Sequence, residues 1–129
     1  MPNLLFDALF APLRGRAGVL LVLADGRQIT GDAFYRMLAH QAAALAGLGV
    51  VKGDRIAAQV PKTPEALALY GAAVALGAVF LPLNTAYTAA EVDYFLGDAR
   101  PKVFVCEGSK ALGLAVVAGR YGAEVLTMD

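Results

Sequence analysis

Residues 55–83 read RIAAQVPKTPEALALYGAAVALGAVFLPL, two short apolar runs separated by a helical pattern. The runs at 55–60 and 78–81 predict strands, because short apolar runs bounded by turn signals are typical of buried strands. Residues 64–76 predict a helix, since Thr63 can cap its first turn and a proline occupies its first position. Gly77 is expected to stop this helix in the left-handed conformation. Two strands joined by a helix favour a parallel pair. The segment therefore predicts a strand–helix–strand unit.

The same alternation extends in both directions. Residues 19–23 and 27–30 predict an N-terminal hairpin around the turn signal Asp25-Gly26. Further strands are expected at 102–106 and 124–127. Further helices are expected to begin at Thr30 or Asp32, with an end at Gly49, and near Thr88 and Ser109. The strands after the hairpin are uniformly apolar, which is typical of strands buried on both faces. The sequence thus predicts an α/β fold, a layered and mainly parallel sheet flanked by helices with an N-terminal hairpin, and residues 1–129 are expected to form one partial domain.

The composition limits the possible partners. Eleven basic residues balance eleven acidic residues, which gives no basic footprint for nucleic acid and no polybasic patch for a membrane. The apolar share of 58% exceeds the roughly 45–50% of an ordinary domain. We therefore expect a face that is normally covered, and self-association through that face when it is exposed. Gly77 and Pro82 divide the apolar stretch 66–83, which argues against a membrane span.

The residues that most often carry chemistry are few. His40 is the only histidine, and it falls away from the apolar stripe of its helix, so a solvated role is favoured. Cys106 is the only cysteine; it ends a buried strand and excludes an intramolecular disulfide, which fits a cytoplasmic setting. The segment Gly108-Ser109-Lys110 lacks the spacing of a phosphate-binding loop and is interpreted as a polar helix start. The acidic residues of one helix are interpreted as solvated charges: Glu91, Asp93 and Asp98. No catalytic, cofactor-binding or metal-binding residue is predicted.

Three spaced motifs carry a resemblance to a known family. They are Gln28–Phe34 (QITGDAF), Gly49–Ala57 (GVVKGDRIA) and Leu76–Asn84 (LGAVFLPLN). In this order they resemble the core motifs of the acyl-adenylate-forming enzymes, the acyl-CoA synthetases and their kin. Two further segments, Pro82–Thr88 (PLNTAYT) and Glu91–Phe95 (EVDYF), are similar to the malonyl-CoA synthetase branch.

The resemblance implies a ligase that joins malonate to ATP with the help of Mg²⁺, giving malonyl-adenylate, and then transfers the malonyl group to coenzyme A. Enzymes of this family are several times longer than 129 residues, and their phosphate-binding loop and catalytic lysine lie beyond the position of Asp129. The chain is therefore expected to be an N-terminal fragment that is inactive and binds no cofactor alone. Asn84 and Thr85 follow a parallel strand, where ligands often bind, although a structural cap is favoured for both.

Two alternatives stay open at this stage. The first is a fragment of another acyl-CoA or aryl-CoA synthetase, because the residues that select the acid would lie beyond Asp129. The second is a non-catalytic α/β interaction module that keeps the scaffold without the ligase chemistry.

Overall fold

Four parallel strands form the central sheet of the computed structural model, which describes residues 2–129. The strands lie in the order β4-β3-β5-β6. Their bounds are β3 (Arg55–Gln59), β4 (Val79–Pro82), β5 (Val103–Cys106) and β6 (Glu124–Thr127). In register, Ile56 pairs with both Phe80 and Val103. The predicted α/β fold with a mainly parallel sheet is confirmed.

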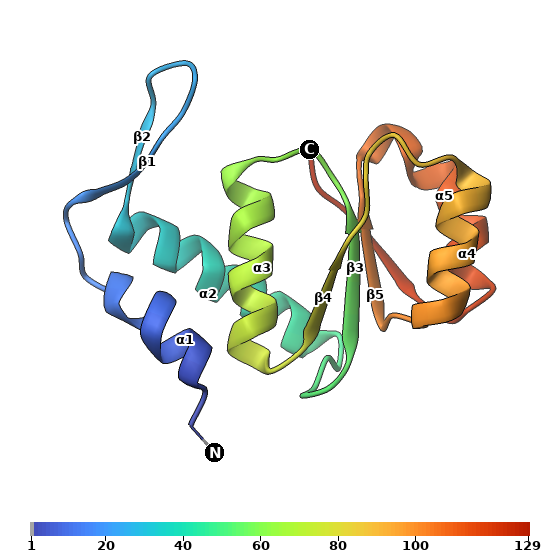
Figure 1. Cartoon of the computed structure of the whole chain (residues 1–129), viewed down its shortest axis with the longest axis horizontal. Helices are drawn as coiled ribbons and strands as arrows, with labels where there is room; N and C mark the ends of the chain where they lie inside the picture. The colour runs from blue at the N-terminus through green and yellow to red at the C-terminus, as the bar shows by residue number, and fades with distance from the viewer. Residues whose placement is uncertain (1) are drawn as a thin grey trace.

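Helices cover both faces of this sheet (Figure 1). Helices α2 (Gly31–Gly47) and α3 (Pro64–Leu76) pack on one face, and α4 (Ala89–Ala99) and α5 (Ala111–Gly119) pack on the other. Successive strand residues serve opposite layers, as the two-residue period of a strand requires. Ile56 and Ala58 belong to the core under α2 and α3, whereas Ala57 belongs to the core under α4 and α5.

The N-terminal region adds a third cluster on the outer side of α2 and α3. Helix α1 (Leu4–Leu9) is followed by a 3-10 turn (Ala11–Leu13), and buried Phe10 and Phe34 stack with ring centroids 6.4 Å apart. Strands β1 (Val19–Val22) and β2 (Gln28–Thr30) pair antiparallel, which confirms the predicted hairpin. The hairpin projects from the body of the molecule at the N-terminal end of α2 (Figure 1).

Threonine side chains begin three of the four long helices. The hydroxyls of Thr30, Thr63 and Thr88 accept hydrogen bonds from backbone N–H groups three residues onward, as predicted for the last two. Gly77 ends α3 with φ +70°, which confirms the predicted left-handed stop. The apolar stretch 66–83 is divided between α3 and β4, and within residues 2–129 no helix combines the length and apolarity needed to cross a membrane.

The prediction that all sheet strands are buried on both faces is wrong for β4 and β6. Both lie at sheet edges, and the Val79 side chain is 52% exposed. Pro82 is the last residue of β4 rather than the stop after it. The Val79 N–H donates to the Asp54 carbonyl before β3, and the Leu83 N–H donates to the Ala58 carbonyl in β3. Because alternate residues of a strand direct their N–H groups to opposite sides, position 82 faces away from β3. A proline there, which has no N–H, breaks no hydrogen bond of the sheet.

Three smaller boundaries also differ from expectation. Helix α2 ends at Gly47, so Gly49, with φ +89°, lies in the following turn rather than at the helix end. A 3-10 turn occupies residues 108–110, and α5 therefore starts at Ala111 instead of Ser109. Residues 12–18, which the sequence predicts as a loop, begin within a 3-10 turn at 11–13. Such differences of one or two residues are usual at helix ends, where hydrogen bonding changes gradually.

Candidate functional site

The loops after β3, β4 and β5 meet at the carboxyl edge of the sheet, the side where ligands of parallel α/β folds usually bind. A pocket of about 350 Å³ opens there, and its polar lining comes from Gln59, Ser109 and Lys110. Gln59 ends β3, whereas Ser109 and Lys110 lie in the 3-10 turn that leads into α5. We call this hollow the carboxyl-edge pocket.

Gln59 is the polar centre of this pocket. Its side chain is 1% exposed, and its Nε2 donates to the backbone oxygens of Asn84 at 3.0 Å and Tyr87 at 3.1 Å. Only the NH₂ group of the Gln59 amide can donate hydrogen bonds to two carbonyl oxygens. These two bonds therefore determine which end of the amide is nitrogen and which is oxygen. The Oε1 atom has no hydrogen-bond partner among the described residues. A buried acceptor without a partner is unusual in a folded protein and marks a place where a ligand or water donates.

Positive charge reaches the mouth of the same pocket. The Lys110 ammonium donates to the Thr85 backbone oxygen at 3.1 Å and lies 3.9 Å from a Glu107 carboxylate oxygen. The lysine therefore joins the loop after β4 to the loop after β5. Because its side chain is 36% exposed, the ammonium can also meet an anionic group that enters from solvent.

Asn84 and Thr85 help to hold the loop after β4, but neither is the helix cap that the sequence favoured, because Thr88 caps α4. The Asn84 Oδ1 atom accepts from the Ala86 N–H at 2.9 Å, which closes a local turn. Thr85 contributes its backbone oxygen to Lys110. The sequence analysis missed Gln59, although an amide at the end of an otherwise apolar strand was a visible signal.

The other chemistry-bearing side chains do not join this pocket as reactive groups. His40 is exposed on α2, as predicted. Cys106 is fully buried, and burial raises the pKa of its thiol. Asp93 is not simply solvated, because it accepts from Arg120 at 2.8 Å and from the Tyr121 hydroxyl, and that hydroxyl bond raises the pKa of Tyr121. These bonds connect α4 to the end of α5.

The geometry suits positioning rather than bond making. No paired nucleophile and base line the carboxyl-edge pocket, and residues 2–129 contain no group of three His, Cys, Asp or Glu side chains placed to hold a metal ion. The described residues therefore do not fit a Mg²⁺ site. What the pocket offers to a ligand is one partly exposed cation, Lys110, at the end of a sheet.

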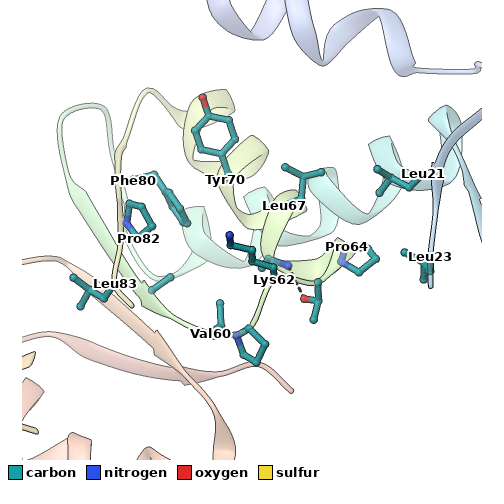
Figure 2. Close-up of a pocket in the computed structure, with 14 residues that line it drawn as sticks. Leu21, Leu23, Val60, Lys62, Pro64, Leu67, Tyr70, Phe80, Pro82 and Leu83 are labelled. Atoms are coloured by element: carbon teal, nitrogen blue, oxygen red, sulfur yellow. Dashed lines mark hydrogen bonds between the residues drawn. The ribbon is translucent and has the colours of Figure 1, made fainter. Parts of the chain in front are cut away.

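A second hollow is larger and almost entirely apolar (Figure 2). This apolar groove has a volume of about 570 Å³ and lies between the hairpin, the start of α3 and the outer side of β4. Figure 2 shows Leu21 and Leu23 of the hairpin segment on one side and Phe80 and Pro82 of β4 on the other. Lys62 extends between them. Apart from Lys62 the groove has no charged residue in its lining.

Fold and sequence together define the class of this protein. The family model described as "AMP-binding enzyme" matches residues 13–127, and the chain belongs to that family. Among solved structures, apo MatB from Rhodopseudomonas palustris is similar with a TM-score of 0.93 and 43% identity, over 99% of this chain and 26% of MatB.

Two further matches, one more distant and one shorter, are named as fatty-acid CoA ligases. A putative long-chain-fatty-acid CoA ligase from R. palustris shares 28% identity at a TM-score of 0.77, over 98% of this chain and 31% of that protein. The long-chain-fatty-acid–CoA ligase FadD13 of Mycobacterium tuberculosis is 43% identical over 61 residues, which are 47% of this chain and 12% of FadD13. The chain thus spans about a quarter of MatB and an eighth of FadD13.

Proposed function

We propose that this chain is the N-terminal scaffold of an AMP-forming ligase that activates malonate. The supporting observation is the extent of the match to MatB, a malonyl-CoA synthetase, with 43% identity sustained over 99% of the chain. A fatty-acid ligase compared over the same length shares only 28% identity. FadD13 reaches 43% over less than half of the chain, so that likeness reflects family motifs rather than one substrate.

The proposed reaction has two steps. A malonate carboxylate oxygen attacks the α-phosphorus of ATP, giving malonyl-adenylate and releasing pyrophosphate. The coenzyme A thiol then attacks the acyl carbon, forming malonyl-CoA and releasing AMP. MatB with ATP bound has a fold equivalent to this chain, with a TM-score of 0.92, which supports ATP as the first substrate. A Mg²⁺ ion bound elsewhere in that ligase would supply charge neutralisation at the phosphates, and the described residues contribute no cluster to hold it.

In that ligase the chain's own residues position rather than react. Gln59 holds the loop at 84–87 with two hydrogen bonds from its Nε2 atom. Lys110 adds a partly exposed cation to the pocket lining. This cation suits a negatively charged substrate portion, which ATP and coenzyme A both have.

The proposal also includes the setting of the isolated chain. We place the ligase in the cytoplasm, with small-molecule substrates and with neither nucleic acid nor membrane as a partner.

Alone, the chain leaves large apolar side chains exposed, such as Leu112 at 91% and Val22 at 68%, and this surface supports self-association. Analytical ultracentrifugation over a wide concentration range should detect a dimer or a larger species, and a constant monomer would contradict this part.

The test of the function begins with the reading frame. Sequencing past the codon for Asp129 identifies the complete product, which is then assayed for AMP release with malonate, acetate, octanoate and benzoate. Malonate-dependent AMP release is expected. A preference for octanoate or benzoate would mean that the chain belongs to another acyl-CoA or aryl-CoA synthetase. A stop codon directly after Asp129 would favour the non-catalytic interaction module.

A further inference from the structure

The Asp129 side chain reaches from the end of β6 to the loop after β5. Its Oδ1 atom accepts a hydrogen bond from the Gly108 N–H at 2.8 Å. The contact is close, because a Cβ atom at position 108 would lie 2.9 Å from the Asp129 Oδ2 atom. The Met128 N–H donates to the Cys106 carbonyl at 2.9 Å, so the backbone pairing of β5 and β6 continues up to this point. Asp129 therefore lies where these two strands end together.

This carboxylate takes the place of a local cap. Gly108 begins the 3-10 turn at 108–110, and the first N–H groups of a helical turn have no partner within the turn. The residue just before such a turn often supplies the acceptor from its side chain, but Glu107 makes no such bond. Asp129 supplies the acceptor from the neighbouring strand, so the position of the turn depends on the end of β6.

Lys110 is the last residue of the same turn and lines the carboxyl-edge pocket. Its ammonium donates to the Thr85 carbonyl, which joins the turn to the loop after β4. A free lysine side chain samples many rotamers, and a ligand must remove that freedom when it binds. A turn that is fixed at Gly108 and a side chain that is held at Thr85 leave less freedom for the ligand to remove.

We propose that Asp129 is a positioning residue of the carboxyl-edge pocket. Its carboxylate fixes the 3-10 turn so that Lys110 presents its ammonium to a phosphate group of a substrate, either ATP or coenzyme A. The phosphate part of this inference rests on the proposed function, whereas the link between Asp129 and Lys110 does not.

The charges around Lys110 suit this division of roles. The ammonium lies 3.9 Å from a Glu107 carboxylate oxygen and forms no ion pair with Asp129 among residues 2–129. Asp129 thus holds the turn through the backbone and does not neutralise the cation. Because Glu107 offsets part of the positive charge, a strongly charged anion such as a phosphate is the appropriate partner, and lysine is a common phosphate-binding side chain.

Lysine acetylation measures the link between Asp129 and Lys110 in the chain itself. The parent, Asp129→Ala and Asp129→Asn react with a limiting amount of an acetyl ester, and peptide mapping compares Lys110 with distant Lys62 in each sample. Every protein carries the same short Gly-Ser extension, so that the terminal carboxylate cannot replace the missing side chain. Glu124→Ala is the matched control, since Glu124 is an exposed acidic residue at the other end of β6.

We expect Lys110 to react at least about threefold faster, relative to Lys62, in Asp129→Ala than in the parent, because a loosened turn frees the ammonium. Asp129→Asn keeps a side-chain oxygen acceptor and should react like the parent, and so should Glu124→Ala. Equal reactivity of Lys110 in the parent and in Asp129→Ala would overturn the proposal. An equal increase in Glu124→Ala would also overturn it, because the effect would then come from any change in β6.

Kinetics separate a positioning role from a structural one. In the in-frame chimera with the part of R. palustris MatB that has no counterpart here, Asp129→Ala should raise the KM for ATP or for coenzyme A at least about threefold, with a smaller change in kcat. A rise for only one of them identifies the source of the phosphate. In a Lys110→Ala background the same substitution should add nothing, because Asp129 acts through Lys110.

Unchanged KM values for both substrates, or full additivity of the two substitutions, would overturn the proposal. Asp129→Asn should restore the parent values, since it keeps the acceptor for Gly108. If the chimera forms no AMP from malonate, the dissociation constants of ATP and coenzyme A replace KM in the same comparison. The malonate proposal can therefore fail independently of the positioning role.

Discussion

Gly71 of α3 lies directly against Leu38 of α2, and a Cβ atom at position 71 would overlap the Leu38 Cδ1 atom. Leu38 is 2% exposed and belongs to the cluster that also contains Phe10 and Phe34. The absence of a side chain at Gly71 thus lets the two helices approach closely. This contact fixes the helix layer between the sheet and the N-terminal cluster.

Gly71→Ala should lower the stability of the chain, although alanine is the better helix former. Gly113→Ala in α5 is the matched control, since a Cβ there meets no atom within 4 Å. Both changes gain the same helix propensity, so their difference isolates the overlap with Leu38. We expect Gly71→Ala to be less stable than Gly113→Ala by about 1–3 kcal/mol in urea denaturation. Equal midpoints would show that α2 and α3 are not in this contact.

A second prediction concerns the turn between α3 and β4. Gly77 has φ +70°, a conformation that L-residues disfavour, and a Cβ there would lie 3.0 Å from the Lys52 Cγ atom. Gly77→Ala is therefore expected to cost about 1–2 kcal/mol of unfolding free energy. Gly47→Ala, at a position with open space and no positive φ, should not destabilise the chain. A Gly77→Ala variant as stable as the parent would refute the left-handed conformation.

Gln59 allows a prediction about the carboxyl-edge pocket. Gln59→Leu keeps most of the volume but leaves the Asn84 and Tyr87 carbonyls without their donor, so the unfolding free energy should fall by about 1–3 kcal/mol. The loop at 84–87 should then exchange its amide hydrogens faster, whereas the hairpin should not change. Unaltered exchange in this loop would mean that the amide does not hold it.

Gln59→Glu should make the stability of the folded chain depend on pH in a defined direction. A buried carboxylate beside two carbonyl oxygens is strongly disfavoured unless it is protonated, so its pKa in the folded state would rise. A raised pKa contributes stability at low pH that is lost as the pH increases. We therefore expect the melting temperature of Gln59→Glu, measured relative to the parent chain, to fall as the pH increases from about 4 to 7. A constant difference would place residue 59 in contact with water.

The thiol of Cys106 predicts a loss of stability in alkali. Burial raises its folded-state pKa above the ordinary value, so the folded chain keeps a proton that the unfolded chain releases. This contribution is complete below the unfolded pKa of about 8.5 and declines as the pH rises above it. Between about pH 8 and 9.5 the urea midpoint of the parent chain should fall more steeply than that of Cys106→Ala. Parallel slopes for the two proteins would contradict a buried, protonated thiol.

Local sequence patterns were sufficient to predict most helices, strands and turns, because residues close in sequence determine where these elements begin and end. Thr63, Pro64 and Gly77 mark both ends of α3, and Asp25-Gly26 marks the hairpin turn. Burial of β4 was misjudged for a different reason. Its residues are as apolar as those of a central strand, and whether a strand lies at the edge depends on sheet order, which composition does not encode.

The candidate site was harder to predict than the fold. Gln59 gains its significance from Asn84 and Tyr87, which are 25 and 28 residues away, and no local pattern relates these positions. The apolar groove has the same origin, since it combines the hairpin segment with β4. The excess of apolar residues indicated exposed apolar surface without giving its position, and the structure shows such surface lining the groove.

Malonate-dependent AMP release tests the scaffold role most directly when it is measured for two proteins, the 129-residue chain alone and its in-frame chimera with the remaining part of R. palustris MatB. We predict that the chimera releases AMP only when malonate and ATP are both present and that the purified chain alone releases none. Turnover by the chain alone, or a folded chimera that binds ATP but never forms AMP from malonate, would contradict a scaffold role in a malonate-activating ligase.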